Sequence, residues 1–506
     1  MTPPVLDVLI AGAGPTGLFL AVWLTRLGVR VRIVDPKSGP VQETRAIAVQ
    51  ARTLEFYDQL GFGDAARARG RHFDRLNVFV RGRERAAVRL NGLAADVTPH
   101  PYLYILTQDQ NEHLLVDQLR ALGVRVEWGT AVTGVAQDDA GVTVTLTRGA
   151  RTEEVRATAV AGCDGGRSAV RHALRVPLSG GTYDQRFYVA DITARGRLRA
   201  DDVNLSLSDD DFLACFPLPG RDRHRVAGRL PPGAPDHAGF SEVRGALEAQ
   251  GLARVEAVHW FSTYRVHHRV ADAFQVGRAF LLGDAAHVHT PVGGQGMNTG
   301  LGDAANLAWK LAHVRRGAPA ALLGTYGAER RPFAVSLVRT TDRVFTALVQ
   351  RGPVARAVRV RILPALLRGV TRPRAVRRAL FLTVSQTRLH YPRSPLSVGR
   401  AGRVRGGDRL PWVPHAGGSN HDALRSLAWQ VHVYGAPHPE LLAWCARREV
   451  PLRVFPCGTQ ARRAGLLEGA AYLVRPDGYV GLAVAGATVP ALDAYAARWF
   501  PPEPAR

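Results

Sequence analysis

The chain has 506 residues, which is enough for about three domains that each bury most of the surface of the unfolded segment. Its content of 46% hydrophobic and 22% charged residues is typical of a soluble globular protein. The formal net charge is +23, and such an excess of positive charge can indicate nucleic acid or an acidic surface as a partner.

The positive charge does not gather in one stripe. All but two of the 66 basic residues are arginine, and they are spread along the chain, so a coding bias explains them better than nucleic-acid binding does. The densest run, 351–378, has apolar residues at helical spacing, and we interpret its arginines as the solvated side of helices that pack on a core.

Targeting segments and metal motifs are not predicted. No N-terminal basic region precedes an apolar core with a small-residue cleavage site, so no signal peptide is predicted. The apolar run 5–24 is interrupted by Asp7, Pro15 and several glycines, so it does not indicate a membrane span. The four cysteines have no C-x-x-C or metal-ligand spacing, which favours a reduced, cytoplasmic protein without a metal site. The adjacent His267 and His268 have no third ligand near them in the sequence.

The N-terminal stretch predicts a dinucleotide-binding unit. A buried strand over 5–11 leads into Gly12-Ala13-Gly14-Pro15-Thr16-Gly17, a helix over 18–27 and a second strand over 31–34 that ends at Asp35. This is the G-x-G-x-x-G pattern in its strand–turn–helix setting, with an acid about 20 residues further on. Gly12 makes the turn, Gly14 lets the backbone approach a pyrophosphate, and Gly17 allows close packing of helix on strand. Asp35 would accept hydrogen bonds from ribose hydroxyls.

A second stretch, 278–312, predicts a ligand site at the end of another strand. An apolar strand over 279–282 ends at Gly283-Asp284, and the glycine-rich loop from Pro291 to Asn298 leads into a helix. Ligands bind at the carboxyl ends of strands in open α/β sheets. The bare backbone of Gly293, Gly294 and Gly296 and the positive end of the helix would favour a flat, partly anionic group.

Further motifs follow in chain order. Arg45 lies in Thr44-Arg45-Ala46-Ile47, Gln108 and Glu112 open a helix that ends near Leu122, and a strand over 157–161 ends at Cys163-Asp164-Gly165. The last pattern places a second carboxylate at a strand end.

Taken together, these motifs resemble the class A flavoprotein monooxygenases, the family of p-hydroxybenzoate hydroxylase, phenol hydroxylase and the polyketide aromatic hydroxylases. The resemblance rests on six motifs in family order over residues 5–332, of which Glu329-Arg330-Arg331-Pro332 is the last. It implies a monooxygenase with non-covalent FAD that uses NAD(P)H and O2 to hydroxylate an aromatic or polyketide-like small molecule through a flavin hydroperoxide.

The resemblance also implies the site residues. Catalytic roles fall to Arg45, beside the pyrophosphate and the nicotinamide cofactor, and to Pro291 and Gly294 at the flavin ring. Cofactor contacts are expected from the glycine loops and the strand-end acids, namely Gly12, Gly14, Pro15, Thr16, Gly17, Asp35, Arg45, Gln108, Asp164, Gly283, Asp284, Pro291, Gly294, Gly296, Met297 and Asn298. No residue is identified as a base for the substrate, and His287 is interpreted as structural.

The predicted fold class is α/β, with a Rossmann-like FAD-binding domain into which an antiparallel substrate sheet is inserted. We expect the FAD-binding domain at 1–72, 103–180 and 268–345, and the substrate domain at 73–102 and 181–267. A helical segment and linker would span 346–398. Residues 399–506 resemble the thioredoxin-like domain of phenol hydroxylase, but they lack its C-x-x-C, so we assign that unit to packing or dimer contacts.

The same motifs also have to be compared with those of other flavoproteins. A disulfide reductase would need a second G-x-G-x-x-G and paired cysteines, and a flavin halogenase would need a W-x-W-x-I-P segment; the sequence has neither. An antibiotic-inactivating monooxygenase of the tetracycline or rifamycin type fits the same motifs. A catalytically inactive flavin- or ligand-binding protein belongs to a different class and stays open, as does the choice between a monomer and a homodimer.

Overall fold

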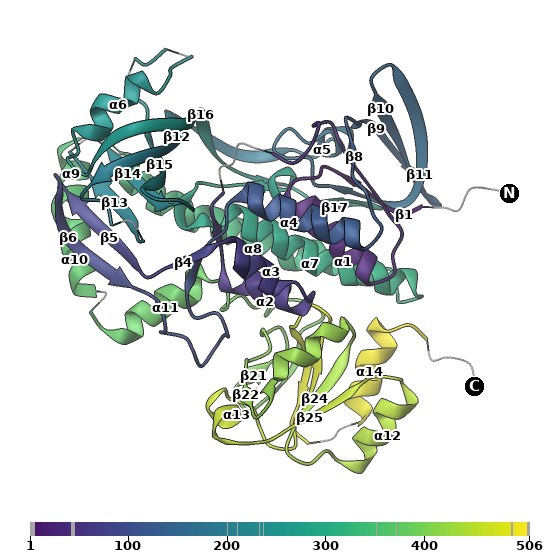
Figure 1. Ribbon diagram of the computed structural model, residues 1–506. Coiled ribbons are helices and arrows are strands. Elements are labelled where there is room, and N and C mark those ends of the chain that lie inside the picture. The colour runs from purple at the N-terminus through teal and green to yellow at the C-terminus, as the bar shows by residue number, and fades with distance from the viewer. Residues whose placement is uncertain are drawn as a thin grey trace.

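A computed structural model describes residues 6–41, 46–199, 201–209, 211–231, 233–235, 237–350, 352–370, 372–486 and 489–502. Two eight-stranded sheets lie at opposite ends of the upper body in Figure 1, and a smaller α/β unit lies beneath them. We call this last part, residues 398–502, the C-terminal unit. No helix among the described residues is long and apolar enough to cross a membrane.

The first sheet has a parallel centre in the order β18-β11-β1-β2-β8. Its strands are β18 Ala279–Leu281, β11 Arg151–Gly162, β1 Leu6–Ala11, β2 Val31–Asp35 and β8 Glu127–Trp128. The short strand β17 Gln275–Val276 pairs antiparallel with β18 at one edge. The hairpin of β9 Ala131–Asp138 and β10 Gly141–Arg148 belongs to the same sheet, and β10 pairs antiparallel with β11.

The register of the central strands fixes where their loops lie. Ala11 of β1 pairs with Gly162 of β11, and Gly162 pairs with Leu281 of β18. The three strands therefore end side by side, and the loops that follow them meet at one edge of the sheet. The side chains at these strand ends are buried because helices cover the sheet there, as expected for parallel strands, whereas the first half of β11 is exposed.

Two helices pack against each other beside this edge. Helix α1 Pro15–Arg26 follows the first loop, and α7 Gly296–Arg315 follows the glycine-rich loop. Helix α4 Gln108–Ala121 packs on the other side of α1. Sixteen of the 20 residues of α7 are buried, so this helix lies in the core and has no broad solvent face.

The second sheet is largely antiparallel, in the order β19-β16-β12-β15-β14-β13-β5-β6. Its longest strands are β12 Leu178–Gly196 and β16 Ala253–Ala271, with 19 residues each. They extend from the body of this sheet toward the first sheet (Figure 1). The remaining strands are β5 Arg75–Val80, β6 Arg83–Arg89, β13 Val203–Leu207, β14 Phe212–Pro217, β15 Arg223–Arg229 and β19 His287–Val288. Helix α6 Ser241–Glu248 packs on β16.

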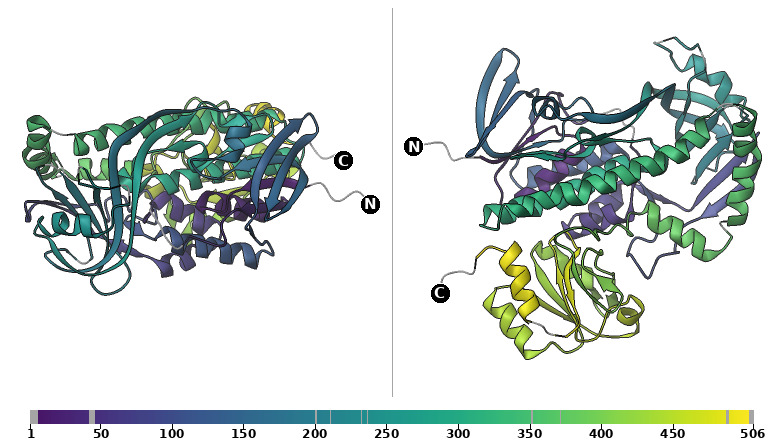
Figure 2. Two further views of the ribbon diagram at one scale, coloured as in Figure 1. Left: turned by 90° about the horizontal axis from the view of Figure 1, so that it is seen from above. Right: turned by 180° about the vertical axis from the view of Figure 1, so that it is seen from behind.

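A long helix, α8 Ala321–Val349, joins the two sheets and continues through Pro332 (Figure 2). Helical pieces follow it: α9 Pro353–Ala357, a π-helical turn Val358–Ile362, α10 Leu363–Val370 and α11 Arg374–Val384. Within the expected linker region, Ser394 is buried and donates a hydrogen bond to Glu329 on α8, whereas Pro392, Arg393 and Pro395 are exposed.

The C-terminal unit has a six-stranded sheet in the order β21-β20-β27-β26-β24-β25. Its strands are β20 Val398–Ala401, β21 Val404–Arg405, β24 Gln430–Tyr434, β25 Leu452–Phe455, β26 Ala471–Val474 and β27 Val480–Val484. Helices α12 Pro439–Arg447 and α14 Val489–Trp499 pack together beside it. The turn between β26 and β27 carries Arg475 and Asp477.

Candidate active site

The loop after β1 shows three different requirements for glycine. A Cβ atom on Gly12 would lie 2.4 Å from the carbonyl oxygen of Cys163, and one on Gly17 would lie 1.9 Å from the carbonyl oxygen of Gly12. A Cβ on Gly14 would meet nothing within 4 Å. Gly12 and Gly17 are therefore fixed by packing of the protein itself, whereas Gly14 borders open space.

The start of α1 offers unused hydrogen-bond donors. No side chain caps the helix, its first turn has no acid, and no acceptor is found for the N–H groups of Gly14, Thr16 and Gly17 among the described residues. Free amides at a helix start form an anion site. The Thr16 hydroxyl packs so closely on Gly283 and Gly300 that Cβ atoms there would lie 2.6 and 2.2 Å from it.

Asp35 ends β2 next to this loop, where its carboxylate holds the loop in shape. It accepts the N–H of Ala13 at 2.6 Å and the N–H of Lys37 at 2.8 Å, and it is 4% exposed. Each carboxylate oxygen has a second lone pair, so Asp35 can also accept from a ribose hydroxyl.

Two further acids follow β11 and β18. One oxygen of Asp164 accepts the N–H of Val170 at 3.1 Å, and the other is buried without a partner among the described residues. Burial raises the pKa of Asp164. Asp284 is exposed, directly after Gly283. Both positions agree with the prediction of carboxylates at one edge of the sheet.

The sequence did not point to Asp303 on α7, which fixes the turn that carries Asp284. One oxygen of this carboxylate accepts the N–H of Gly283 at 3.1 Å and lies 2.7 Å from Nε2 of His287. The other accepts Nε of Arg330 at 2.6 Å. Asp303, His287 and Arg330 are at most 1% exposed. His287 is thus bonded inside the protein, in agreement with its interpretation as structural.

The glycine-rich loop before α7 is held by Asn298. The Asn298 amide accepts the Gln50 N–H and the Thr53 hydroxyl, each at 2.8 Å, and donates to the carbonyl oxygens of Ala48 and Gly294. All four hydrogen-bonding positions of this side chain are used, so a hydrogen bond from Asn298 to a ligand would come from its backbone N–H. Gly293 and Gly294 have φ values of 73° and 61°, a conformation that favours glycine.

Helix α7 begins with free donors, as α1 does. The first turn has no acid, and no acceptor is found for the N–H groups of Gly296, Met297 and Asn298 in the part of the chain that the structure describes. Together with the helix dipole, they would stabilise a negative charge by about 0.3–2 kcal/mol. Pro291 is exposed at the start of the loop.

Several buried polar atoms around this loop have no partner within the described residues. They are Oε1 of Gln50, Nε2 of His289 and Oγ1 of Thr290. Nδ1 of His289 lies 2.8 Å from the Thr290 carbonyl oxygen, and burial lowers the pKa of this histidine to about 4. A neutral ring with its proton on Nδ1 keeps Nε2 as an acceptor. Unpaired buried groups are costly, so they indicate a polar ligand at this place.

Of the remaining predicted site residues, Gln108 is placed by the structure, whereas Arg45 is not among the residues that it describes. Gln108 donates to Glu112 at 3.0 Å at the start of α4, and Glu112 accepts the N–H of Val41 at 2.9 Å. Burial raises the pKa of Glu112. Arg45, the residue with an expected catalytic role, lies outside the described residues.

Two helix starts with free amides, three acids and an open glycine edge thus converge at the ends of β1, β2, β11 and β18. This arrangement suits an extended ligand with phosphates at one end and a flat, hydrogen-bonding ring at the other, and defines a flavoprotein of the dinucleotide-binding class. The family described as FAD binding domain matches residues 5–341, and the chain belongs to this family.

Known proteins extend the match to nearly the whole chain. It is 41% identical to 6-methylpretetramide 4-monooxygenase from Streptomyces rimosus, over 94% of this chain and 91% of that protein. It is 30% identical to rifampicin monooxygenase from Rhodococcus hoagii, over 98% of both chains. The structure of OxyS anhydrotetracycline hydroxylase from Streptomyces rimosus superposes with a TM-score of 0.80 at 30% identity, covering 98% of this chain and 99% of that one.

The chain is therefore an FAD-dependent monooxygenase of the aromatic and polyketide hydroxylase type, with NAD(P)H as co-substrate. The α/β fold class and the resemblance inferred from the six motifs are confirmed.

Proposed function

We propose that this enzyme hydroxylates a fused-ring aromatic polyketide of the tetracycline-precursor kind. The observation that carries the proposal is the 41% identity to 6-methylpretetramide 4-monooxygenase over more than nine-tenths of both chains, which includes the second sheet and the C-terminal unit.

The residues of the site would divide the binding of FAD between them. The amides at the start of α1, near Gly14, would bind the pyrophosphate, and Asp35 would accept from the adenosine ribose. Asp284 and Asp164 would face the sugar-alcohol chain. Bound FAD supplies the transfer of electrons from NAD(P)H and the activation of O2. The amides of Gly296, Met297 and Asn298 would stabilise negative charge on the reduced ring as preorganised donors.

The substrate would lie between the glycine-rich loop and the second sheet. Val292 of the loop belongs to an apolar cluster with side chains of that sheet and of α8. Partly buried apolar side chains surround a fully buried aromatic centre in this cluster, and they include Tyr183, Leu205, Tyr264 and Val292. Aromatic and aliphatic walls suit a flat, fused-ring substrate and keep water away from the reacting atoms.

A second candidate function is modification of an ansamycin antibiotic. The full-length similarity to rifampicin monooxygenase supports it, although the identity is lower, at 30%. The two functions differ in the shape of the substrate, since one ligand is a flat ring system and the other a bridged macrocycle.

The deciding experiment is turnover under 18O2 with a panel of tetracycline precursors, rifampicin and simple phenols. We expect oxidation of NAD(P)H to rise with a tetracycline precursor and the product to contain one labelled oxygen atom. Faster oxidation with rifampicin alone would favour the second function. Label that arrives only from water, or a product without new oxygen, would exclude oxygenation.

We also propose that the enzyme acts in the cytoplasm, where NAD(P)H is available, as a monomer or homodimer. The four cysteines are free thiols in the structure, which suits a reducing compartment.

A further inference from the structure

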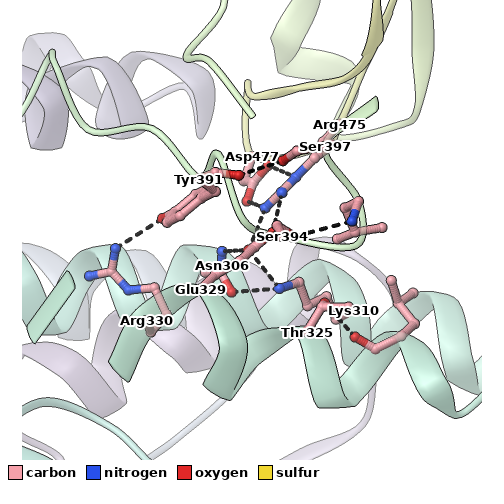
Figure 3. Close-up of polar contacts among 12 residues, drawn as sticks. Asn306, Lys310, Thr325, Glu329, Arg330, Tyr391, Ser394, Ser397, Arg475 and Asp477 are labelled. Atoms are coloured by element: carbon pink, nitrogen blue, oxygen red, sulfur yellow. Dashed lines mark hydrogen bonds and ion pairs between the residues drawn. The ribbon is translucent and has the colours of Figure 1, made fainter. Parts of the chain in front are cut away.

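Four charged side chains are buried together where the C-terminal unit meets α7 and α8, and we call them the buried charge cluster. They are Lys310 on α7, Glu329 on α8, and Arg475 and Asp477 on the turn between β26 and β27 (Figure 3). Each side chain is at most 1% exposed. Two positive and two negative charges balance within the cluster.

Glu329 is the centre of the buried charge cluster. Its carboxylate accepts hydrogen bonds from both Nη atoms of Arg475, at 2.6 and 3.0 Å, and from Nζ of Lys310, at 2.8 Å. It also accepts the Ser394 hydroxyl and the Asn306 amide, each at 2.6 Å. Five charge-assisted hydrogen bonds from four side chains leave this carboxylate in one geometry.

Arg475 is fixed from its other side by Asp477. Nε and Nη2 of Arg475 lie 2.9 and 2.6 Å from the two oxygens of Asp477. The planar guanidinium therefore bridges two carboxylates in the plane of its fork, a geometry that lysine cannot reproduce. Losing any of these contacts would leave a buried charge without its partner, which is strongly destabilising. The cluster therefore favours a single position of the turn relative to α8.

The residue after Glu329 leads to the proposed flavin site. Arg330 donates to Asp303 at 2.6 Å and to the carbonyl oxygen of Thr299, in the first turns of α7, at 3.0 Å. Asp303 in turn holds Gly283 and His287, the two ends of the turn that carries Asp284. The buried charge cluster is thus linked to the flavin-site turn through Arg330, the neighbour of Glu329 on α8, and through Asp303.

A second contact follows the same direction. The Tyr391 hydroxyl accepts a hydrogen bond from Nη1 of Arg330 at 3.0 Å, and its ring packs on Tyr479 of the C-terminal unit with centroids 4.7 Å apart. Arg330 is therefore linked to the C-terminal unit in two ways, through its chain neighbour Glu329 and through Tyr391.

We propose that Arg475 is a positioning residue for the flavin-binding turn, acting through Glu329 and Arg330 on Asp303. The C-terminal unit then serves the oxygenation reaction by fixing the place of Asp284 and of the start of α7. This inference rests on the proposed location of FAD at that turn.

The test compares FAD binding and the reduction potential of bound FAD in two charge-balanced double variants. Arg475→Met with Asp477→Asn removes one positive and one negative charge from the buried charge cluster. Arg447→Met with Asp493→Asn makes the same changes in an exposed ion pair of the C-terminal unit, whose atoms lie 2.9 Å apart. The probe is FAD added to the apoprotein, followed by flavin fluorescence and by reductive titration of the full-length chain.

We expect the buried double variant to weaken FAD binding at least about fivefold, the lower range of coupling between linked sites, and to shift the flavin potential. The exposed control should stay within about twofold of the wild type, as expected for a surface pair. A folded buried variant with unchanged affinity and potential would overturn the positioning role. If that variant does not fold, FAD affinity and flavin potential are measured in Arg475→Lys instead. This variant keeps the positive charge but loses the two-point contact.

The readouts separate this proposal from the proposed substrate. FAD affinity and potential are measured without substrate, so an error in the substrate class leaves the comparison intact. A wild-type chain that hydroxylates a tetracycline precursor, while the buried variant binds FAD unchanged, refutes only the positioning role.

Discussion

Asp303 and His287 are 16 residues apart in the chain, and the carboxylate of one lies 2.7 Å from Nε2 of the other. The same oxygen accepts the N–H of Gly283, so one buried side chain closes both ends of the turn that carries Asp284. The geometry of Asp284, a proposed cofactor contact, is thus set by a residue that is itself 0% exposed.

Replacing this carboxylate tests its role. Asp303→Asn leaves the buried Arg330 without a charged partner, and breaking a buried ion pair costs about 3–5 kcal/mol. We expect a lower thermal midpoint together with weaker FAD binding, measured by differential scanning fluorimetry and fluorescence titration. Tyr391→Phe removes one hydrogen bond from the same arginine, and its loss of about 1 kcal/mol serves as the comparison. Equal losses in the two variants would contradict a special role for Asp303.

Gly12 and Gly14 should respond in opposite ways to alanine. Gly12→Ala puts a methyl group 2.4 Å from a carbonyl oxygen at a residue with φ of 99°, so we expect the apoprotein to be destabilised. Gly14→Ala meets no protein atom and has φ of −78°, so folding should be unchanged or improved by about 0.4–1 kcal/mol. The added methyl would instead occupy the space proposed for the pyrophosphate.

Urea unfolding of the apoprotein and titration with FAD separate these effects. We expect Gly14→Ala to lower FAD affinity at least about tenfold, which corresponds to about 1.4 kcal/mol. Normal FAD binding by a folded Gly14→Ala variant would place the pyrophosphate elsewhere.

Asp284→Ala should weaken FAD binding while the turn keeps its shape, because the turn is held by Asp303. Loss of one hydrogen bond to a charged group amounts to about 1.5–3 kcal/mol, or more than about tenfold in the dissociation constant. Glu154→Ala, at an exposed site on β11, is the matched control. Affinity within about twofold of the wild type would remove Asp284 from the site.

Local sequence patterns were sufficient for the parts of the site that follow strands. The strand that leads to Gly12, the acid at Asp35 and the turn at Gly283 combine short apolar runs with residues that end them, and these signals do not depend on the rest of the fold. The strand ends meet because parallel strands share their direction, and the sheet pairing brings Gly12, Asp164 and Gly283 to one edge as expected.

The parts that were missed depend on pairing between distant segments. Asp303 and Lys310 stand on a helix that is buried on nearly all sides, so its apolar pattern could not separate a functional acid from a solvent-facing one. Arg475 and Glu329 are 146 residues apart and meet only when the C-terminal unit is in place. The burial of Ser394 has the same cause, since its hydroxyl is one of the donors to Glu329.

The last prediction concerns acid stability of the C-terminal unit. His432 on β24 is 0% exposed, and neither ring nitrogen has a partner among the described residues. Burial lowers the pKa of His432 to about 3. The unfolded chain therefore binds a proton near pH 6.5 that the folded protein does not accept until the pH is far lower, so stability falls as the pH drops below about 6.5.

One histidine of this kind costs about 1.4 kcal/mol per pH unit, or about 2 kcal/mol between pH 6.5 and pH 5. Phe455 packs against His432 with ring centroids 5.0 Å apart, so His432→Phe keeps an apolar, aromatic filling of this site. We expect this variant to lose less unfolding free energy than the wild type over the same range, by about 2 kcal/mol, as measured by urea unfolding at pH 6.5 and pH 5. His113→Leu, at an exposed site on α4, is the control for the replacement of a histidine as such. If His432→Phe and the wild type lose the same free energy, a partner or a water path must let His432 take up its proton in the folded state.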